Sequence, residues 1–231
     1  LNGFRSLTKE TMMIQNIKTY STKFFQIYKR IKKSKGPIFI YSNFKEIGGL
    51  KTLIKFLQRH GYKDYKEHGE SDMSFAVWTG DETIEYKDKI KTIFNKKENT
   101  NGDKIKIFLG TPSIKEGVSL LRVEQVHILE PYWNISRLKQ IMGRAVRYCS
   151  HKDLPPRRRY VDIFLYLATY PNVNTIDQYI WNLAKKKYKL ISKFENSMKE
   201  KAIDCEIFYE ANVYDDEEGL KCDSGLFEDY E

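Results

Sequence analysis

Short apolar segments alternate with amphipathic segments along most of this chain, and this alternation restricts the possible folds more than any other feature. The apolar segments are rich in β-branched and aromatic residues, as strands buried on both faces of a sheet are. They are Pro37–Tyr41, Ser74–Trp78, Lys104–Leu109, Gln125–Leu129 and Tyr160–Ala168. Between them, apolar residues recur at helical spacing in Ile47–Arg59, Ile84–Phe94 and Ile135–Arg147. This order predicts an α/β fold, in which a mainly parallel sheet is flanked by helices and joined by right-handed crossovers.

Two further helical segments flank the alternating region. The N-terminal one covers Thr8–Lys33 and is expected to break at Ser21. The C-terminal one begins at Thr175, which can form a capping box with Gln178. We expect its apolar stripe to pack against the sheet. The stripe consists of Ile176, Tyr179, Ile180, Leu183, Leu190, Ile191 and Phe194.

These segments predict four parts of the chain. Residues 1–33 form an N-terminal helical segment that packs on the domain, and residues 34–172 form the α/β domain itself. Residues 173–205 form the C-terminal helix, and residues 206–231 form an acidic tail. Because the tail is rich in acids and contains glycine, we expect it to be partly disordered.

Charge is distributed unevenly along the sequence. The chain carries 40 Lys and Arg against 31 Asp and Glu, a net charge of +9. Residues 197–231 hold 12 of the acids and 3 of the lysines, so residues 1–196 carry 37 basic and 19 acidic side chains, a net charge of +18. This asymmetry favours a polyanionic partner for the main body, although the lysines could also merely solvate helix faces. No apolar run approaches the roughly 20 residues of a membrane span, so we expect no membrane partner.

The loop that follows Lys104–Leu109 has a composition suited to anions. It contains Thr111, Ser113, Lys115 and Gly117. In an open α/β sheet, ligands bind in loops at the carboxyl ends of the strands. Hydroxyl and backbone N–H groups in such a loop can bind phosphate, but ordinary turns have a similar composition.

The helix predicted at Ile135–Arg147 carries a row of polar residues. Gln140, Gly143, Arg144 and Arg147 follow one another at i, i+3, i+4 and i+7, which places them on one helix face. Two guanidinium groups one turn apart suit a polyphosphate, whose charge they can neutralise. The alternative is that both arginines lie in solvent and pair with carboxylates. The cysteines and histidines lack the spacing of a zinc site, so we expect no bound metal.

Taken in order, these segments resemble the motifs of superfamily 2 helicases. Gly36–Phe44 is similar to motif IV, and the residues from Thr111 to Arg147 are similar to motifs V and VI. Trp133 and Asn134, just before motif VI, resemble the Swi/Snf-type branch, which translocates on duplex DNA. A narrower likeness is to the helicase-like ATPases of large cytoplasmic DNA viruses, of the nucleoside triphosphatase I and early transcription factor small-subunit type. It is carried by Val126–Asn134 and Gly143–His151.

This resemblance implies a three-layer RecA-like domain, the second of two such domains that hold ATP between them. The implied catalytic residues, which stabilise the transition state and position the phosphates or the attacking water, are Arg144, Arg147 and Gln140. The residues implied to lie beside the nucleotide are Gly117, Glu116 and Gly143. The residues implied to contact nucleic acid are Ser42, Asn43, Thr111, Ser113, Lys115, Trp133 and Asn134.

The sequence departs from the family pattern in two places. It contains no Gly-x-x-x-x-Gly-Lys-Ser/Thr phosphate loop and no acidic motif in a magnesium-binding context. Pro112 stands where some branches carry an Asp that contacts the ribose. We therefore expect ATP and Mg²⁺ to be bound mainly by an N-terminal RecA-like domain of the same protein, and this chain alone to be inactive as an ATPase.

Two functions remain open from the sequence. The first is the C-terminal motor half of an ATP-dependent helicase or translocase that acts on DNA or RNA in viral transcription. Its further partner would be the viral RNA polymerase, and its location would be the viral factory in the host cytoplasm and the virion. The second is a non-catalytic module that binds nucleic acid or docks on the polymerase.

Overall fold

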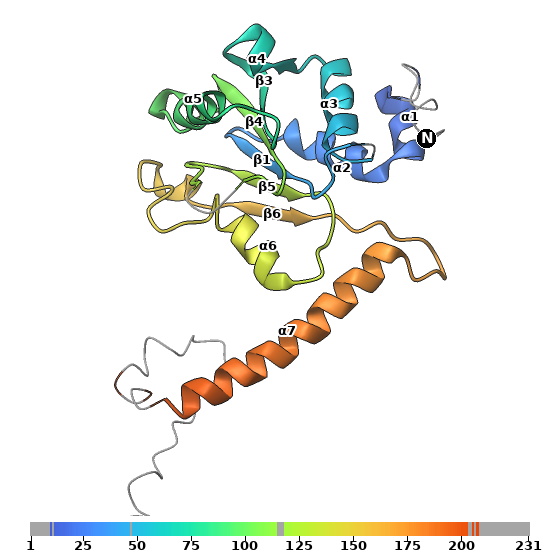
Figure 1. The fold of residues 1–231 in the computed structure, drawn as a ribbon. Helices are drawn as coiled ribbons and strands as arrows, with labels where there is room; N and C mark the ends of the chain where they lie inside the picture. The colour runs from blue at the N-terminus through green and yellow to red at the C-terminus, as the bar shows by residue number, and fades with distance from the viewer. Residues whose placement is uncertain are drawn as a thin grey trace, which may run out of the picture.

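A parallel six-stranded sheet forms the centre of the molecule (Figure 1). The structure, a computed structural model, describes residues 10, 12–46, 48–114, 118–202, 205 and 207. The strands are β1 (Ile38–Tyr41), β2 (Lys63–Asp64), β3 (Ser71–Trp78), β4 (Ile105–Gly110), β5 (Gln125–Ile128) and β6 (Asp162–Leu165). Their order is β2-β3-β4-β1-β5-β6, and each neighbouring pair is parallel. The predicted α/β fold class is therefore confirmed.

Helices cover both faces of this sheet. They are α1 (Ile14–Tyr20), α2 (Thr22–Ile31), α3 (Leu50–Arg59), α4 (Tyr65–His68), α5 (Ile84–Phe94), α6 (Ile135–Met142) and α7 (Ile176–Glu200), with short 3₁₀ helices η2 (Lys97–Asn99) and η3 (Pro156–Arg158). The alternation of side chains along β1 separates two apolar layers. Ile38 and Ile40 pack in the layer of α2 and α3, whereas Phe39 and Tyr41 pack in the layer of α5 and α6.

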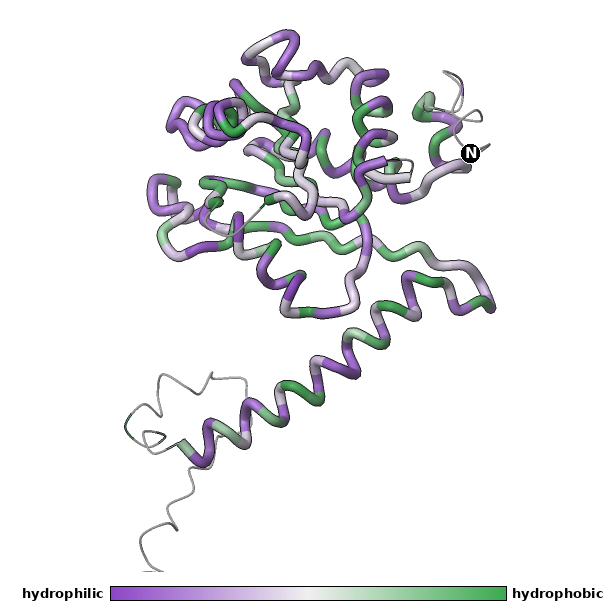
Figure 2. Tube along the Cα trace, in the orientation of Figure 1, coloured by the Kyte–Doolittle hydropathy of each residue, from purple (hydrophilic) through white to green (hydrophobic). Residues whose placement is uncertain are grey.

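Aromatic rings fill the layer beneath α5. The ring of Phe108 on β4 lies 5.1 Å from that of Phe94, 5.9 Å from that of Trp78 and 6.3 Å from that of Phe39, centroid to centroid. Edge-to-face and tilted pairs of this kind add to the stabilisation that burial of the rings already provides. In the hydropathy colouring, the apolar residues accordingly concentrate on the strands and on the inner sides of the helices (Figure 2).

Several local predictions are confirmed. Helix α5 has the predicted bounds, because Thr83 accepts a hydrogen bond from the backbone N–H of Tyr86 and so caps its first turn. Ser21 ends α1 and caps α2 by accepting from the backbone N–H of Phe24, which explains the predicted break. Thr175 and Gln178 form both hydrogen bonds of a capping box.

The prediction that the C-terminal helix packs against the sheet is wrong. Helix α7 runs beneath α6 and away from the sheet (Figure 1). Most of the predicted stripe is exposed, and among its large apolar side chains Ile176 is 73%, Leu190 72% and Phe194 67% exposed. Helical periodicity identifies an apolar face but does not reveal what covers it. Among the described residues, none of the helices combines the length and the apolar character that crossing a membrane requires.

A buried histidine lies in the layer beneath α2. The imidazole of His127 on β5 is 3.1 Å from the side-chain oxygen of Gln125 and 2.8 Å from the hydroxyl of Tyr166. Because the Gln125 oxygen can only accept, His127 Nε2 carries the hydrogen and Nδ1 accepts from Tyr166. The guanidinium of Arg30 stacks 4.6 Å from the centre of the Phe164 ring beside this cluster. Burial, assisted by the positive charge of Arg30, lowers the pKa of His127 to about 3.

This low pKa predicts a loss of stability in acid. Because the folded-state pKa of His127 lies below its unfolded value of about 6.5, the neutral imidazole stabilises the fold fully above pH 6.5 and progressively less down to pH 3. The loss should approach about 1.4 kcal/mol per pH unit within that window. Urea unfolding from pH 7 to pH 4 should show a clearly shallower decline for His127→Gln than for the parent, whereas replacement of the exposed His68 by Gln should keep the parental slope. Equal slopes for the parent and His127→Gln would contradict this account.

Candidate nucleotide and nucleic-acid interface

The loops after β1 and β5 are joined by a buried carboxylate. Glu130 accepts a hydrogen bond from the hydroxyl of Ser42 at 2.8 Å and another from the backbone N–H of Asn43 at 3.1 Å. Burial raises the pKa of the Glu130 carboxyl, and these two hydrogen bonds partly counteract the effect. Glu130 therefore fixes the position of the loop that begins at Ser42.

Ser42 and Asn43 differ in what they can offer to a ligand. The side chain of Ser42 is fully buried, and its hydroxyl is engaged by Glu130 and by the backbone of Phe44. Asn43 is only half-buried, and its side-chain oxygen accepts from the hydroxyl of Tyr41 at 3.0 Å. In this arrangement Ser42 positions the loop, while Asn43 is the one of the two that lies near solvent.

The predicted phosphate-binding loop after β4 is tied to the end of β3. The hydroxyls of Thr111 and Ser113 lie 2.9 Å apart, and each is 3.3 Å from the carbonyl oxygen of Trp78. The indole N–H of Trp78 donates to the backbone carbonyl of Ser113. Thr111 is buried and Ser113 is half-buried. The remaining predicted residues of this loop lie outside the described residues: Lys115, Glu116 and Gly117.

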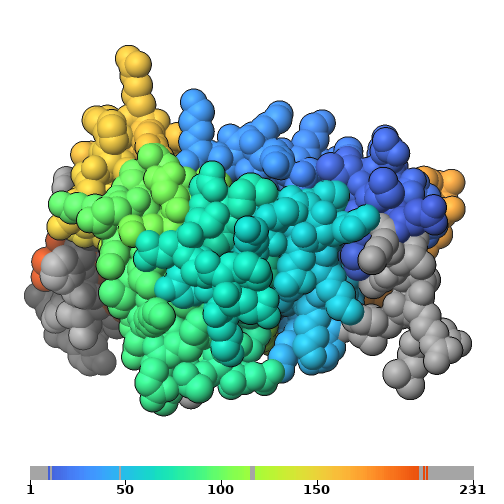
Figure 3. Space-filling model, turned by 90° about the horizontal axis from the view of Figure 1, so that it is seen from above, coloured from blue at the N-terminus to red at the C-terminus, as the bar shows by residue number. Residues whose placement is uncertain are grey.

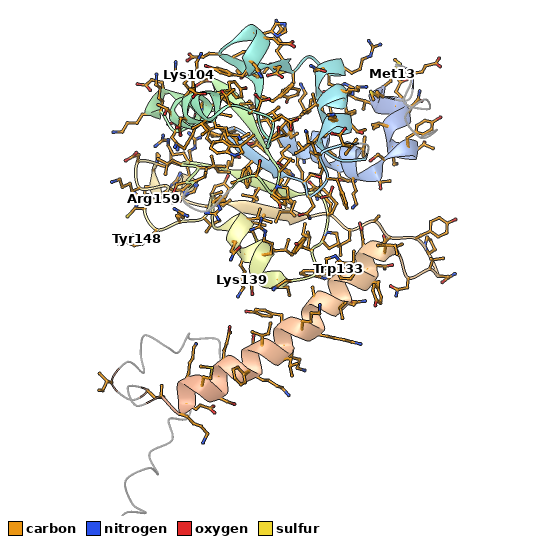
Figure 4. All side chains as sticks on the ribbon, viewed as in Figure 1. Met13, Lys104, Trp133, Lys139, Tyr148 and Arg159 are labelled. Atoms are coloured by element: carbon orange, nitrogen blue, oxygen red, sulfur yellow. The ribbon has the colours of Figure 1, made fainter. Side chains whose placement is uncertain are left out.

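Trp133 and Asn134 form the entrance to α6. Asn134 caps this helix, since its side-chain oxygen accepts from the backbone N–H of Ser136 at 2.8 Å. Trp133 is exposed and meets the ring of Tyr179 on α7 edge to face, with the ring centres 6.4 Å apart. Trp133 and Lys139 both lie on the side of the domain that faces α7 (Figure 4). The side chain of Asn134 therefore stabilises the start of α6, whereas Trp133 exposes an aromatic ring to solvent.

Helix α6 ends at Met142, five residues earlier than predicted. The carbonyl oxygen of Arg144 accepts from the backbone N–H of Leu120 at 2.8 Å, so it is not free to continue the helix. Ser150 provides hydrogen bonds to two backbone groups beyond the helix end. Its hydroxyl accepts from the backbone N–H of Arg147 and lies 3.3 Å from the carbonyl oxygen of Ala145. The prediction that Gln140, Gly143, Arg144 and Arg147 share one helix face is therefore wrong.

Arg144 lies at a small cavity under α6. Its side chain is only 7% exposed. The cavity has a volume of about 10 Å³, comparable to one water molecule. Its polar lining comes from Arg144, Arg137, Gln140 and Tyr41. Arg137 donates to the side-chain oxygen of Gln140 at 3.4 Å. Two arginines and a glutamine thus line one cavity, and side chains of these types suit a polyphosphate.

Arg147 lies in different surroundings. It is exposed, and its guanidinium donates to the hydroxyl of Ser119 at 2.6 Å and to the carbonyl oxygen of Gly143 at 3.1 Å. It lines an open groove of about 460 Å³ together with Lys152, Arg159 and Tyr160. Arg159 and Tyr148 mark this edge of the domain, opposite the edge with Trp133 (Figure 4). The structure therefore separates the two arginines that the sequence analysis paired.

Arg137 and Glu130 belong to the candidate site but were not among the residues predicted for it. Arg137 precedes Gln140 by three residues, so helical spacing could have placed it on the same face. Glu130 directly follows the residues predicted as a strand, but nothing in the sequence indicates that its carboxylate binds the loop after β1. Among the described residues, His, Cys, Asp and Glu form no group of three or more that could hold a metal ion.

Comparison with known proteins identifies the family. Residues 22–149 match the family described as the helicase conserved C-terminal domain. A protein of Acanthamoeba polyphaga mimivirus, named as an ATP-dependent RNA helicase, is 47% identical over 96% of this chain and 39% of its own length. Nucleoside triphosphatase I of Melanoplus sanguinipes entomopoxvirus is 30% identical over 83% of this chain and 28% of its length. A termination factor NPH-I homolog of African swine fever virus is 31% identical over 80% of this chain and 33% of its length.

A solved structure with a similar fold is the C-terminal part of the Fun30 ATPase domain. It superposes with a TM-score of 0.54 at 19% identity, over 70% of this chain and 44% of that chain. The chain spans well under half the length of each curated relative named above. The parallel RecA-like sheet, the helix that begins at Asn134 and the family match over residues 22–149 agree, and the chain belongs to the helicase conserved C-terminal domain family of superfamily 2.

Proposed function

We propose that this domain is the C-terminal motor half of an ATP-dependent helicase or translocase. The observation that carries the proposal is the placement of Arg144, which is buried and lines one cavity together with Arg137 and Gln140. A guanidinium that is held in place before the substrate arrives can stabilise charge that develops in a transition state without further reorganisation. Arg144 would supply this charge to ATP bound by a second domain.

The side chains of this site have the chemistry that a triphosphate requires. Arg137 and Arg144 each carry a planar fork of N–H groups, and Gln140 carries an amide. ATP is held mainly by the N-terminal domain in this proposal, and Mg²⁺ would be held there as well. Arg147 would reach the same nucleotide after releasing the hydroxyl of Ser119. Gly143 would let the nucleotide approach the end of α6, since a Cβ there meets only the helix carbonyls at 3.2 and 3.5 Å.

The nucleic acid would cross the loops at the carboxyl ends of β1 and β4. Asn43 and Ser113, which are half-buried, and the exposed Trp133 are the candidates for direct contact. Amide and hydroxyl groups can contact phosphates, and an exposed indole can stack on a base. Ser42, Thr111 and Asn134 would act through these residues, because their own polar groups bind within the protein.

We place this activity in viral transcription. The supporting observation is the similarity to a termination factor homolog and to a nucleoside triphosphatase I, both of them viral. In this proposal the domain works with the viral RNA polymerase, in the viral factory of the host cytoplasm and in the virion. Whether the track is DNA or RNA is decided by which polymer stimulates ATP hydrolysis.

The 231-residue chain alone is expected to show negligible ATPase activity, because the residues that would hold the phosphates and Mg²⁺ are absent from its sequence. A phosphate-release assay with and without single-stranded and duplex nucleic acid measures this. The longer protein, in which an N-terminal ATP-binding half precedes this domain, is the positive control and should be stimulated by its track. Robust magnesium-dependent turnover by the chain alone would contradict the two-domain proposal.

The second candidate function is a non-catalytic module that binds nucleic acid or docks on the polymerase. The net charge of +18 on residues 1–196 favours binding to a polyanion whether or not ATP is hydrolysed. Under this alternative the arginines of the site would matter only as charges. Arg144→Lys, which preserves the charge but removes the fork, would then retain the function of the parent.

A further inference from the structure

Helix α7 has two distinct faces. Asp177, Trp181, Ala184 and Tyr188 follow one another at i, i+4, i+7 and i+11 and form the row that faces the body. Asp177 accepts from Lys23 and from the backbone N–H of Ala168, Trp181 packs against the core layer of α5 and α6, and Tyr188 accepts from Lys139. Ala184 is fully buried. This row attaches α7 to the domain.

The second face is apolar and has no cover among the described residues. It lies roughly 100° around the helix axis from the row that faces the body. Its C-terminal half consists of Leu190, Ile191, Phe194 and Met198, which are 72%, 38%, 67% and 60% exposed. In the hydropathy colouring, green segments recur along the part of α7 that leaves the body (Figure 2). Four large apolar side chains in adjacent helical turns form an exposed patch, which usually indicates an interaction site.

Lysines border this patch. Lys186, Lys189 and Lys193 follow one another at i, i+3 and i+7, and all three are exposed. Helix α7 as a whole contains six lysines and three acids, a net charge of +3. A second copy of α7 would therefore bring like charges together, whereas an acidic and apolar segment would match both the patch and its border.

Residues 206–231 have that composition. They contain ten acids and a single lysine, a net charge of −9. Nine large apolar or aromatic residues are interspersed with these acids: Ile207, Phe208, Tyr209, Val213, Tyr214, Leu220, Leu226, Phe227 and Tyr230. Ile207, the one of these that the structure describes, is 77% exposed. Acidic clusters such as Asp215–Glu218 complement the lysine row, and the neighbouring aromatic residues complement the apolar patch.

Chain length permits this contact within one molecule. An α-helix of 25 residues is about 37 Å long, and a fully extended segment of 26 residues can span about 90 Å. The tail follows the last residue of α7, Glu200, after five residues in the sequence. A short tether gives an effective concentration in the millimolar range, which favours an attached partner over a second molecule.

We propose that the acidic tail, residues 206–231, docks on the exposed apolar face of α7 in the same molecule. The apolar tail residues cover Leu190, Ile191, Phe194 and Met198. The acids of the tail pair with Lys186, Lys189 and Lys193. The tail thereby shields an amphipathic basic helix that would otherwise be open to other partners.

Photo-crosslinking from the patch tests this directly. A benzophenone amino acid replaces Phe194 in the full 231-residue chain, and the irradiated protein is digested and analysed by mass spectrometry. We expect crosslinks to peptides of residues 206–231, formed within one molecule when ¹⁵N-labelled and unlabelled chains are mixed. The matched control places the same group at Ile84 on α5, which is 74% exposed and distant from α7, and it should not label the tail.

Charge exchange tests the complementarity. Lys186→Glu, Lys189→Glu and Lys193→Glu together should lower the crosslink yield about tenfold, and 0.5 M salt should lower it in the parent. The same charge change at the exposed Lys29, Lys63 and Lys96 should leave the yield unaltered. When the three α7 lysines are Glu, changing Asp215, Asp216, Glu217 and Glu218 to Lys as well should restore the crosslink yield. This reversal excludes misfolding of α7 as the cause.

Other outcomes would overturn the proposal. Crosslinks between labelled and unlabelled chains would assign the face to a second copy. Vesicles of anionic lipid that bind the intact chain through the α7 lysines, with no crosslink to the tail, would assign the face to a membrane surface. Crosslinks from position 194 to the body of the domain, or an absence of crosslinks in both parent and charge-exchanged variants, would also show that the tail does not dock there.

Discussion

Replacing Arg144 by Ala in the proposed two-domain protein, in which this domain would follow an ATP-binding half, is expected to lower nucleic-acid-stimulated ATP hydrolysis by about 10³-fold or more. Arg144 is only 7% exposed and lines the cavity with Arg137 and Gln140, so the protein restricts its position before the nucleotide arrives. An arginine that neutralises charge on the transferring phosphoryl group typically contributes about 10³–10⁵ in turnover. Steady-state phosphate release at saturating nucleic acid measures the effect.

Two further variants distinguish a catalytic role of Arg144 from a loss of positive charge and from a general effect of substitution. Arg144→Lys retains the positive charge and most of the buried stem, but it loses the planar fork, so most of the activity should still be lost. Arg59→Ala, on the helix that covers the opposite face of the sheet, should leave the rate within about twofold of the parent. Thermal unfolding confirms that the variants are folded. If Arg144→Ala and Arg144→Lys both hydrolyse ATP at the parental rate, the motor assignment is lost.

The second large effect concerns salt. We expect the affinity of the 231-residue chain for nucleic acid to fall about 10³-fold between 50 and 200 mM monovalent salt. The net charge of +18 on residues 1–196 makes contacts with about six phosphates reasonable, and each contact releases condensed counterions. Fluorescence anisotropy with a labelled oligonucleotide over this range gives the slope of log affinity against log salt.

The groove beside Arg147 provides a matched comparison for this measurement. Lys152→Glu and Arg159→Glu alter two cations that line it at the amino end of β6, away from the loops that the nucleic acid would cross, so the slope should stay within about one of the parental value. The same change at Lys29 and Lys63, which are exposed elsewhere, should have a similarly small effect. An affinity that is insensitive to salt would exclude a phosphate-backbone interaction. Arg144→Ala should reduce this affinity only slightly, since it removes one of many charges, and this separates binding from ATP hydrolysis.

The groove with Lys152 and Arg159 and the contact of Lys23 with α7 lie at opposite ends of the domain (Figure 3). Seen from above, the segments around residues 145–165 in yellow and the N-terminal helices in dark blue lie at opposite ends of the domain (Figure 3). The groove with Lys152 and Arg159 belongs to the first end. Lys23 on α2 belongs to the other end, where its ammonium group binds Asp177 of α7 and the carbonyl oxygen of Leu129. A substitution in one of these regions therefore does not directly alter contacts in the other.

Much of the fold could be predicted because its determinants are local. The strand β1 is predicted by a short continuous run of apolar residues, and the helix α5 is predicted by apolar residues at helical spacing. Ser21 and Thr175 each bind a backbone N–H three residues later, so their effect depends only on neighbours in the sequence. The two-residue strand β2 escaped prediction, since Lys63 and Asp64 are polar and pair with β3 at the edge of the sheet.

The residues proposed for the site came from the sequence, whereas their arrangement came from the structure. Gln140 and Arg144 do share one cavity, as their spacing suggests. Arg147 does not, because Leu120 binds the carbonyl oxygen of Arg144 and the helix ends before that residue. Ser42 is buried because the carboxylate of Glu130, 88 residues away in the sequence, accepts its hydroxyl hydrogen bond.

The sequence by itself determined the parallel α/β architecture, the family and the set of residues that could carry phosphate chemistry. The tertiary structure alone decided which of those residues meet, and that α7 leaves an apolar face exposed. The physical reason is the range of the interactions. Periodicity and capping act over three or four residues, whereas the end of α6, the burial of Ser42 and the position of α7 depend on hydrogen bonds and ion pairs between distant segments.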